Sequence, residues 1–127
     1  MTNWTPRDLE RIGAADELQL TSFKQDGSRR MPVTVWVVRV GDELYVRAYR
    51  GRETGWFRQI QRRPEGRIAA GGVTKAVTLV DTSSDAALNQ EIDAAYQSKY
   101  RRYSARYVDP MLAPQARATT LKLVPSA

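Results

Sequence analysis

Tight-turn signals between short, valine-rich segments constrain the fold of this 127-residue chain more than any other feature. Asp26-Gly27 lies in the turn sequence KQDGS at residues 24–28, and Gly41-Asp42 follows a run of mostly apolar residues. Asp-Gly pairs are typical of β-hairpins because glycine accepts the positive φ that tight hairpin turns need. The spacing therefore predicts meandering strands with tight turns between several of them.

Six segments have the composition or the alternation of β-strands. They span residues 17–23, 30–40, 43–49, 67–73, 76–80 and 119–124. In the third segment the even-numbered positions are apolar and share one face, and the odd-numbered positions, which include Arg47, share the other. Pro32 has no N–H to donate to a sheet, so we expect the start of the second strand at an edge or beside another element.

Two short helices are expected among these strands. Thr5 and Pro6 begin the first, because threonine caps free N–H groups and proline suits the first helical position. The second is predicted over residues 56–63, with its large apolar residues on one side and Pro64 as its stop.

One long helix is predicted over residues 86–103, after the capping sequence TSSD at residues 82–85. Its stripe at helical spacing consists of Leu88, Ile92, Ala95, Tyr96, Lys99, Tyr100 and Tyr103. Acidic residues lie early and basic residues late, as the helix dipole favours. Pro110 and Pro114 are expected to break the chain before the last strand. Together these elements predict a mainly β protein, a small barrel with helices outside it.

The chain contains no histidine and no cysteine. This excludes thiol nucleophiles, Ser-His-Asp triads and zinc sites with His or Cys ligands, and it removes the commonest axial haem ligands. The carboxylates are scattered, so neither a paired-carboxylate site nor an acidic metal cluster is expected. Any enzymatic chemistry must rest on carboxylates, lysine or tyrosine, or be supplied by a bound cofactor.

A single domain is expected over residues 1–127, because this length is sufficient for one hydrophobic core. The longest apolar run, at residues 33–38, is far too short to cross a bilayer. The first ten residues, MTNWTPRDLE, lack the apolar stretch of a secretory signal. We therefore expect a cytoplasmic protein.

Positive charge is concentrated in RAYRGRETGWFRQIQRRPEGR at residues 47–67, which carries +5 of the chain's +6. Arg50, Gly51 and Arg52 lie just before the helix expected at residues 56–63. Glycine lets a backbone approach an anion, a helix start offers free N–H groups, and guanidinium pairs with phosphate, so the stretch predicts a phosphate-binding loop. The alternatives are a solvated basic loop and a surface for single-stranded nucleic acid, on which the aromatic side chains of the stretch stack with bases.

The last tyrosines of the chain also form a pattern, because Tyr96, Tyr100, Tyr103 and Tyr107 follow at spacings of 4, 3 and 4. This is one face of a helix. Either the rings pack that helix on the barrel with their hydroxyls at its rim, or one tyrosine overhangs a pocket and offers a proton or hydrogen bond to a substrate.

The segment LYVRAYRGRETGWFRQIQRRPEGRIAAGG at residues 44–72 resembles the middle of FMN-binding split β-barrel proteins. A strand leads into a cationic loop with glycine, then into a tryptophan on a short helix, a proline stop and a strand ending in glycines. The pattern KY…Y at residues 99–103 and the closing LKLVP are similar as well. The chain looks closest to a bacterial domain-of-unknown-function family related to deazaflavin-dependent nitroreductase-like and pyridoxamine-phosphate-oxidase-like proteins.

This resemblance implies a six-stranded antiparallel split β-barrel, commonly a homodimer, with FMN or a deazaflavin in a groove at the barrel face. The residues implied to bind the cofactor are Pro32, Val33, Thr34, Arg50, Gly51, Arg52, Trp56 and Arg58. Tyr100 and Tyr103 would line the substrate side. The cationic loop is shorter and richer in arginine than that of the relatives, which carries Ser and Lys.

If the protein is catalytic, the resemblance implies transfer of hydride or electrons between the cofactor and a small organic acceptor, with no side chain covalently involved. The competing class is a non-catalytic barrel that binds another anion, or single-stranded nucleic acid, through the arginine-rich loop.

Overall fold

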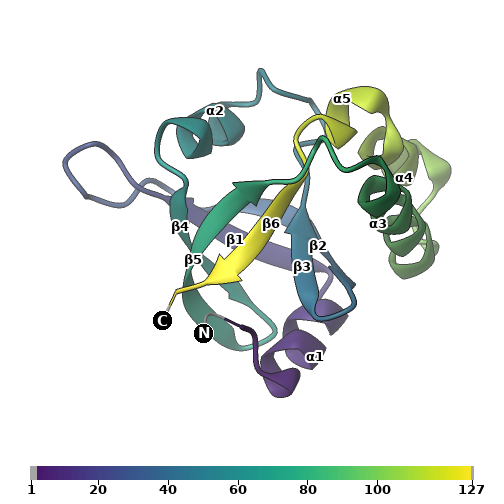
Figure 1. Cartoon of the computed structure of the whole chain (residues 1–127), viewed down its shortest axis with the longest axis horizontal. Helices are drawn as coiled ribbons and strands as arrows, with labels where there is room; N and C mark the ends of the chain where they lie inside the picture. The colour runs from purple at the N-terminus through teal and green to yellow at the C-terminus, as the bar shows by residue number, and fades with distance from the viewer. Residues whose placement is uncertain (1–2, 127) are drawn as a thin grey trace.

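Six antiparallel strands close on themselves in the computed structural model, which describes residues 3–126 (Figure 1). These strands are β1 (Glu17–Ser22), β2 (Val33–Val40), β3 (Glu43–Val46), β4 (Glu65–Ala70), β5 (Val73–Asp81) and β6 (Leu121–Pro125). Their order around the barrel is β1-β2-β3-β6-β5-β4, and β4 pairs with β1 to complete it. The predicted six-stranded antiparallel barrel is confirmed.

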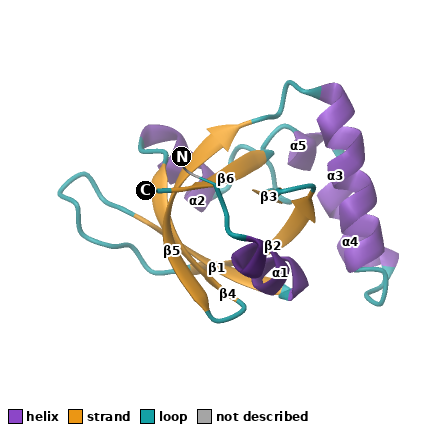
Figure 2. Ribbon diagram, turned by 60° about the horizontal axis from the view of Figure 1, so that its bottom comes forward, coloured by secondary structure: helices purple, strands orange, loops and turns teal. Residues whose placement is uncertain are grey.

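Within the described residues five helices accompany the barrel: α1 (Pro6–Ala14), α2 (Gly55–Arg62), α3 (Ala86–Lys99), α4 (Ala105–Leu112) and α5 (Pro114–Arg117). Figures 1 and 2 show α1 and α2 at opposite ends of the barrel, and α3, α4 and α5 grouped on one side. The long loop between β1 and β2 projects from the other side. In this part of the chain, no helix combines the length and the apolar character needed to cross a membrane.

The barrel interior is filled by the inward-facing residues of all six strands, and its two ends are closed by helices. Leu9 and Ile12 of α1 are buried at one end, and Phe57 and Ile60 of α2 at the other. Each side chain of this size stabilises the fold by roughly 1.5–3 kcal/mol when it is removed from water. The short helix at residues 56–63 was thus predicted correctly to within one residue, and its apolar side is the one that packs.

A second core lies outside the barrel, between β2 and β3 and the helices α3 and α4. Val38 and Tyr45 face these helices, while Val37 and Leu44, their neighbours along the strands, face the interior. The helices contribute Ile92, Tyr96, Tyr100, Val108 and Met111. Strands β2 and β3 are therefore covered on both faces, and side-chain alternation here separates two cores instead of separating core from solvent.

The region after α3 differs from the prediction. The helix expected over residues 86–103 ends at Lys99, and α4 and α5 occupy the segment that the prolines were expected to break. Pro110 lies inside α4, where it removes one backbone hydrogen bond, but burial of Val108 and Met111 holds the helix in place. Pro114 is the first residue of α5, a position that proline favours.

Some strand limits also differ from those expected. The second strand begins at Val33 instead of residue 30, and the third ends at Val46 instead of residue 49. The chain leaves the sheet after Val46 because the Ala48 N–H bonds to the Thr119 hydroxyl and the Ala48 carbonyl accepts from Gly51 N–H, which forms a turn. The predicted face assignment of residues 44–46 is confirmed.

Candidate cofactor-binding cleft

A cleft of about 420 Å³ opens where β2, the segment at residues 47–54, the start of α2 and α4 meet. Four aromatic side chains, one from each of these parts of the chain, form much of its wall: Trp36, Tyr49, Trp56 and Tyr107. Thr34 and Arg106 add polar groups, and Met111 adds an apolar surface. Largely apolar walls with a few polar groups, at a volume in the range of about 300–1,000 Å³, are typical of small-molecule sites.

The start of α2 lies at the edge of this cleft. Thr54 precedes the helix but makes no capping hydrogen bond, because its hydroxyl donates to the Gly51 carbonyl at 2.7 Å. Arg58 N–H makes the first bond back, to the Thr54 carbonyl. The N–H groups of residues 55–57 therefore precede the first intrahelical hydrogen bond, and the helix dipole makes this end attractive to an anion.

Arg47, the first arginine of the cationic stretch, lies under the cleft in a buried network. Its five N–H groups are all used, since Nε donates to Thr120 Oγ1 at 2.9 Å and Nη1 donates to Asp93 Oδ1 at 2.6 Å and to the Met111 carbonyl at 2.9 Å. Nη2 donates to the side chain and the carbonyl of Asn89. No donor of Arg47 remains for a phosphate, so this arginine is structural.

The loop predicted to hold a phosphate spreads its residues in different directions. Arg50 extends over the Tyr49 ring, 5.4 Å from its centroid, and its Nε donates to the Tyr49 hydroxyl, which places it beside the cleft. Arg52 instead faces Asp81 at 4.0 Å and covers Phe57, away from the cleft wall. Gly51 is buried at φ +89° against Gln115 of α5.

Of the other residues that the resemblance implies for cofactor binding, some lie at the cleft and some lie away from it. Thr34 and Trp56 both line the cleft. Val33 lies half-buried beside it in a neighbouring hollow that Trp56 also borders. Pro32 is exposed before β2, and Arg58 is exposed on α2. The structure therefore brings Thr34, Trp56 and Arg50 to the cleft, and it leaves Pro32, Gly51, Arg52 and Arg58 off its wall.

The two tyrosines implied on the substrate side lie behind the cleft. Tyr100 is fully buried, and its ring stacks on Trp36 with centroids 4.0 Å apart. Its hydroxyl lies 2.6 Å from the Asp16 carbonyl and accepts from Val37 N–H, and burial raises the pKa of Tyr100 well above its ordinary value. Tyr103 is partly exposed and packs on the same tryptophan. Tyr107, the last member of the series, is the tyrosine of this group that lines the cleft.

Sequence reasoning did not assign Trp36, Tyr49 or Arg106 to the cofactor site, and it named Tyr107 only as one of four tyrosines of which one overhangs a pocket. The positions of Arg106 and Tyr107 were not foreseen because α4 was not expected. Ser104, a residue type that favours the position before a helix, was the signal for it. In the described residues no group of three or more His, Cys, Asp or Glu side chains is gathered as metal ligands would be.

The closed six-stranded antiparallel barrel is the split-barrel fold expected from the sequence. The chain belongs to a family described as uncharacterized proteins conserved in bacteria (DUF2255), whose profile matches residues 8–123. This confirms the resemblance to a bacterial domain-of-unknown-function family. No curated protein matches the chain.

Solved structures with different ligands in their descriptions share the fold. A FAD-binding protein from Mesorhizobium loti is 10% identical, with a TM-score of 0.64 over 98% of this chain and 92% of that one. HutZ, a haem storage protein from Vibrio cholerae, is 14% identical, with a TM-score of 0.65 over 98% and 92%. An F420 reductase is 13% identical, with a TM-score of 0.54 over 94% and 93%. At these identities the similarity shows the fold, and the ligand must be argued from the site.

Proposed function

We propose that this protein binds a flavin-type nucleotide, FMN or a deazaflavin, with the ring system in the cleft and a phosphate at the start of α2. The observation that carries this proposal is the meeting of two features in one place. Aromatic walls suited to a flat ring lie next to an uncapped helix start suited to an anion.

The charges around the cleft fit this ligand. Arg106 lines the wall, and Arg50 lies beside it on Tyr49. Arg47 and the more exposed Arg117 share the single carboxylate of Asp93, so this group of three side chains carries a net positive charge. An anionic nucleotide is therefore favoured over a neutral or cationic ligand of similar shape.

The cofactor would supply the hydride or electron chemistry that the side chains of this chain lack. The residues themselves bind and orient it: Trp36 and Trp56 offer rings, and Arg50 and Arg106 offer guanidinium donors. An oxidoreductase that acts on a small organic acceptor is the activity we propose for such a complex. We further propose that the protein is a cytoplasmic homodimer in which a partner covers the exposed Tyr49 and Tyr107. Light scattering should then give twice the 14.4 kDa of the chain.

The test is an absorbance spectrum of the purified protein, followed by fluorescence titration with FMN, FAD and the deazaflavin F420. We expect saturable binding of at least one of them. Arg50→Gln and Arg106→Gln should each weaken it by about tenfold or more, since a charge-assisted hydrogen bond contributes roughly 1.5–3 kcal/mol. Arg52→Gln is the matched control, because its guanidinium faces Asp81.

Two results would contradict the proposal. One is a colourless protein that binds none of the three compounds. The other is an equal loss of affinity in all three arginine variants. That second result, combined with a steep dependence on salt, would favour single-stranded nucleic acid or another anion held by diffuse charge.

A further inference from the structure

A second hollow region, which we name the loop groove, lies where the β1–β2 loop meets α2. It consists of two adjoining hollows of about 490 and 400 Å³. Both are lined by Lys24, Arg30 and Gln59, so the two hollows lie side by side. Trp56 borders the larger hollow and also the cofactor cleft, which makes this ring the wall between the two sites.

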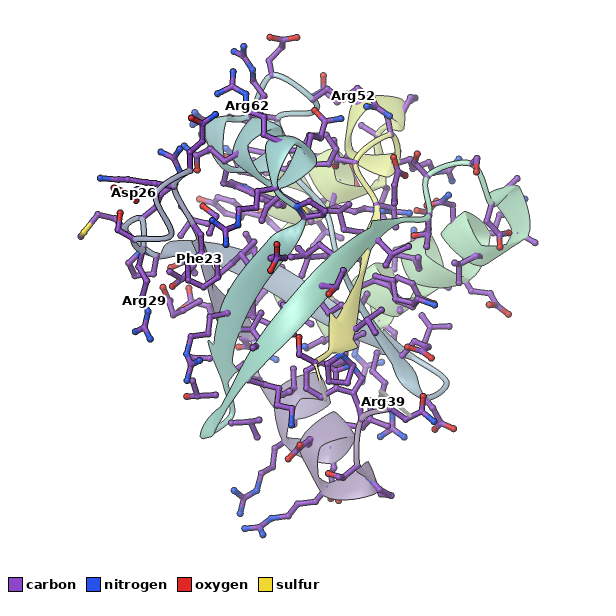
Figure 3. The ribbon with its side chains drawn as sticks, turned by 60° about the vertical axis from the view of Figure 1, so that its left-hand side comes forward. Phe23, Asp26, Arg29, Arg39, Arg52 and Arg62 are labelled. Atoms are coloured by element: carbon purple, nitrogen blue, oxygen red, sulfur yellow. The ribbon has the colours of Figure 1, made fainter. Side chains whose placement is uncertain are left out.

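The loop groove gathers cations that are distant in the sequence. Five basic side chains line it: Lys24, Arg29, Arg30, Arg62 and Arg63. Figure 3 shows Phe23, Asp26 and Arg29 of the loop on the same side of the barrel as Arg62 of α2, and away from Arg39. Like charges at this density repel one another unless an anion neutralises them.

The carboxylate within the loop groove, Asp26, is attracted to Lys24, but this single negative charge does not balance the five cations. Asp26 accepts hydrogen bonds from the Ser28 hydroxyl at 2.6 Å and from the Ser28 N–H at 2.9 Å, and these bonds lower the pKa of Asp26. Arg63 is occupied, because it donates to the Lys24 carbonyl and lies 3.5 Å from Glu65. Among residues 3–126, none of the other four cations forms an ion pair.

Arg30 adds a second, independent sign of a ligand. Its Nε is buried and has no hydrogen-bond partner in the described part of the chain. A buried donor without an acceptor is unfavourable, and native structures satisfy nearly all such groups. Arg30 lines both hollows, so its guanidinium group borders the loop groove, and a shift of this side chain toward an anion there would give Nε the acceptor that it lacks.

We propose that the loop groove is a binding site for a small polyanion, a molecule that carries two or more phosphate or carboxylate groups. Lys24 and Arg30 hold its middle, Arg29 binds at one end, and Arg62 at the other. Gln59 uses its carbonyl oxygen to accept from Ser22, which leaves its amide N–H groups for the ligand. Two charge centres are required because the cations occupy both hollows. This site does not depend on whether a flavin binds in the cleft.

The probe is inorganic triphosphate, titrated by calorimetry into the full-length protein without flavin and at physiological salt. We expect saturable binding with one triphosphate per chain and weaker binding of orthophosphate. Arg30→Gln and Lys24→Gln should each lower the affinity about tenfold, as the loss of a charge-assisted bond does. Arg7→Gln removes the same charge from exposed α1 and should change the affinity less than twofold.

Circular dichroism checks that the variants fold, and Lys24 is exposed, so Lys24→Gln remains informative if Arg30→Gln does not fold. The proposal is overturned if triphosphate does not saturate, or if Arg7→Gln weakens binding as much as Arg30→Gln. The proposal is also overturned if FMN displaces triphosphate and Arg50→Gln weakens the binding of triphosphate, because triphosphate would then occupy the cofactor cleft. The proposal is also wrong if a single-stranded oligonucleotide binds more tightly than triphosphate, with a steep dependence on salt, and Arg30→Gln weakens this binding. The ligand of the loop groove would then be a nucleic acid.

Discussion

Arg47 shows how one residue can change its role between sequence and structure. In the sequence it is one of seven arginines in a basic stretch. In the fold it is almost fully buried and joins β3 to α3, α4 and the start of β6 through Asp93, Asn89, the Met111 carbonyl and Thr120. A charge is tolerated there because every donor has an acceptor.

Arg47→Met should destabilise the protein by about 3 kcal/mol, because removing one partner of a buried ion pair leaves acceptors without donors. Methionine retains most of the volume, so the loss reports on the polar contacts. Chemical unfolding measures the effect. Arg58→Met, at an exposed position on α2, should stay within about 0.5 kcal/mol of the wild type. A loss below about 1 kcal/mol at Arg47 would mean that the network contributes little.

Lys99 makes stability depend on pH. Its ammonium is half-buried, with Nζ 2.6 Å from the Val37 carbonyl, and burial lowers the pKa of Lys99 from 10.5 to about 8. Between these two pKa values the unfolded chain binds a proton that the native chain does not, so stability rises with pH in this window. Above about pH 10 the effect is opposed, because burial raises the pKa of Tyr96 and Tyr100 and the unfolded tyrosines then ionise first.

We therefore expect the free energy of unfolding of the wild type to rise relative to that of Lys99→Met as pH increases from 8 to about 10. Below pH 8 the difference should be constant, because Lys99 is charged in both states. Urea unfolding of both proteins at pH 7, 8, 9 and 9.5 measures it, and the comparison cancels other titrating groups. A difference that is the same at all four pH values would show that Lys99 is not buried as described.

At the scale of elements, the glycines at the end of β4 allow α1 to close the barrel. Residues 69–72 are all small, and the structure shows the backbone of α1 close to Gly71. Gly71 has φ +57°, and a Cβ there would overlap the carbonyl group of Arg11, with 2.7 Å to the carbonyl carbon. The β4–β5 turn and the end of α1 therefore fit together only with glycine.

Gly71→Ala should destabilise the protein by about 2–3 kcal/mol, through both overlap and the positive φ. Gly27→Ala is the matched control, because Gly27 also has a positive φ, at +87°, but has open space around it. We expect a cost there of about 1 kcal/mol from the backbone alone. Thermal unfolding compares the two, and equal losses would show that α1 moves aside without penalty.

At the scale of the whole molecule, charge is distributed around the two candidate sites instead of forming one phosphate loop. Arg50 and Arg106 lie at the cofactor cleft, Arg62 and the loop cations lie at the loop groove, and Arg47 lies in the core. Trp56 lies between the cofactor cleft and the loop groove, so titrations with flavin and with triphosphate test neighbouring but separate surfaces.

The sequence by itself determined the order of the elements along the chain, the hairpins at the tight turns, the start of α1 after Thr5 and the limits of α2 to within one residue. These features depend on turn residues, caps and side-chain alternation, which act between residues a few positions apart.

The tertiary structure decided the rest. Arg47 became structural because Asp93, 46 residues away, lies beside it, and α4 formed around Pro110 because its apolar side is buried. The cleft and the loop groove likewise join segments that only barrel closure brings together. Burial and the choice of hydrogen-bond partner depend on which distant side chains meet, and a local pattern does not contain that information.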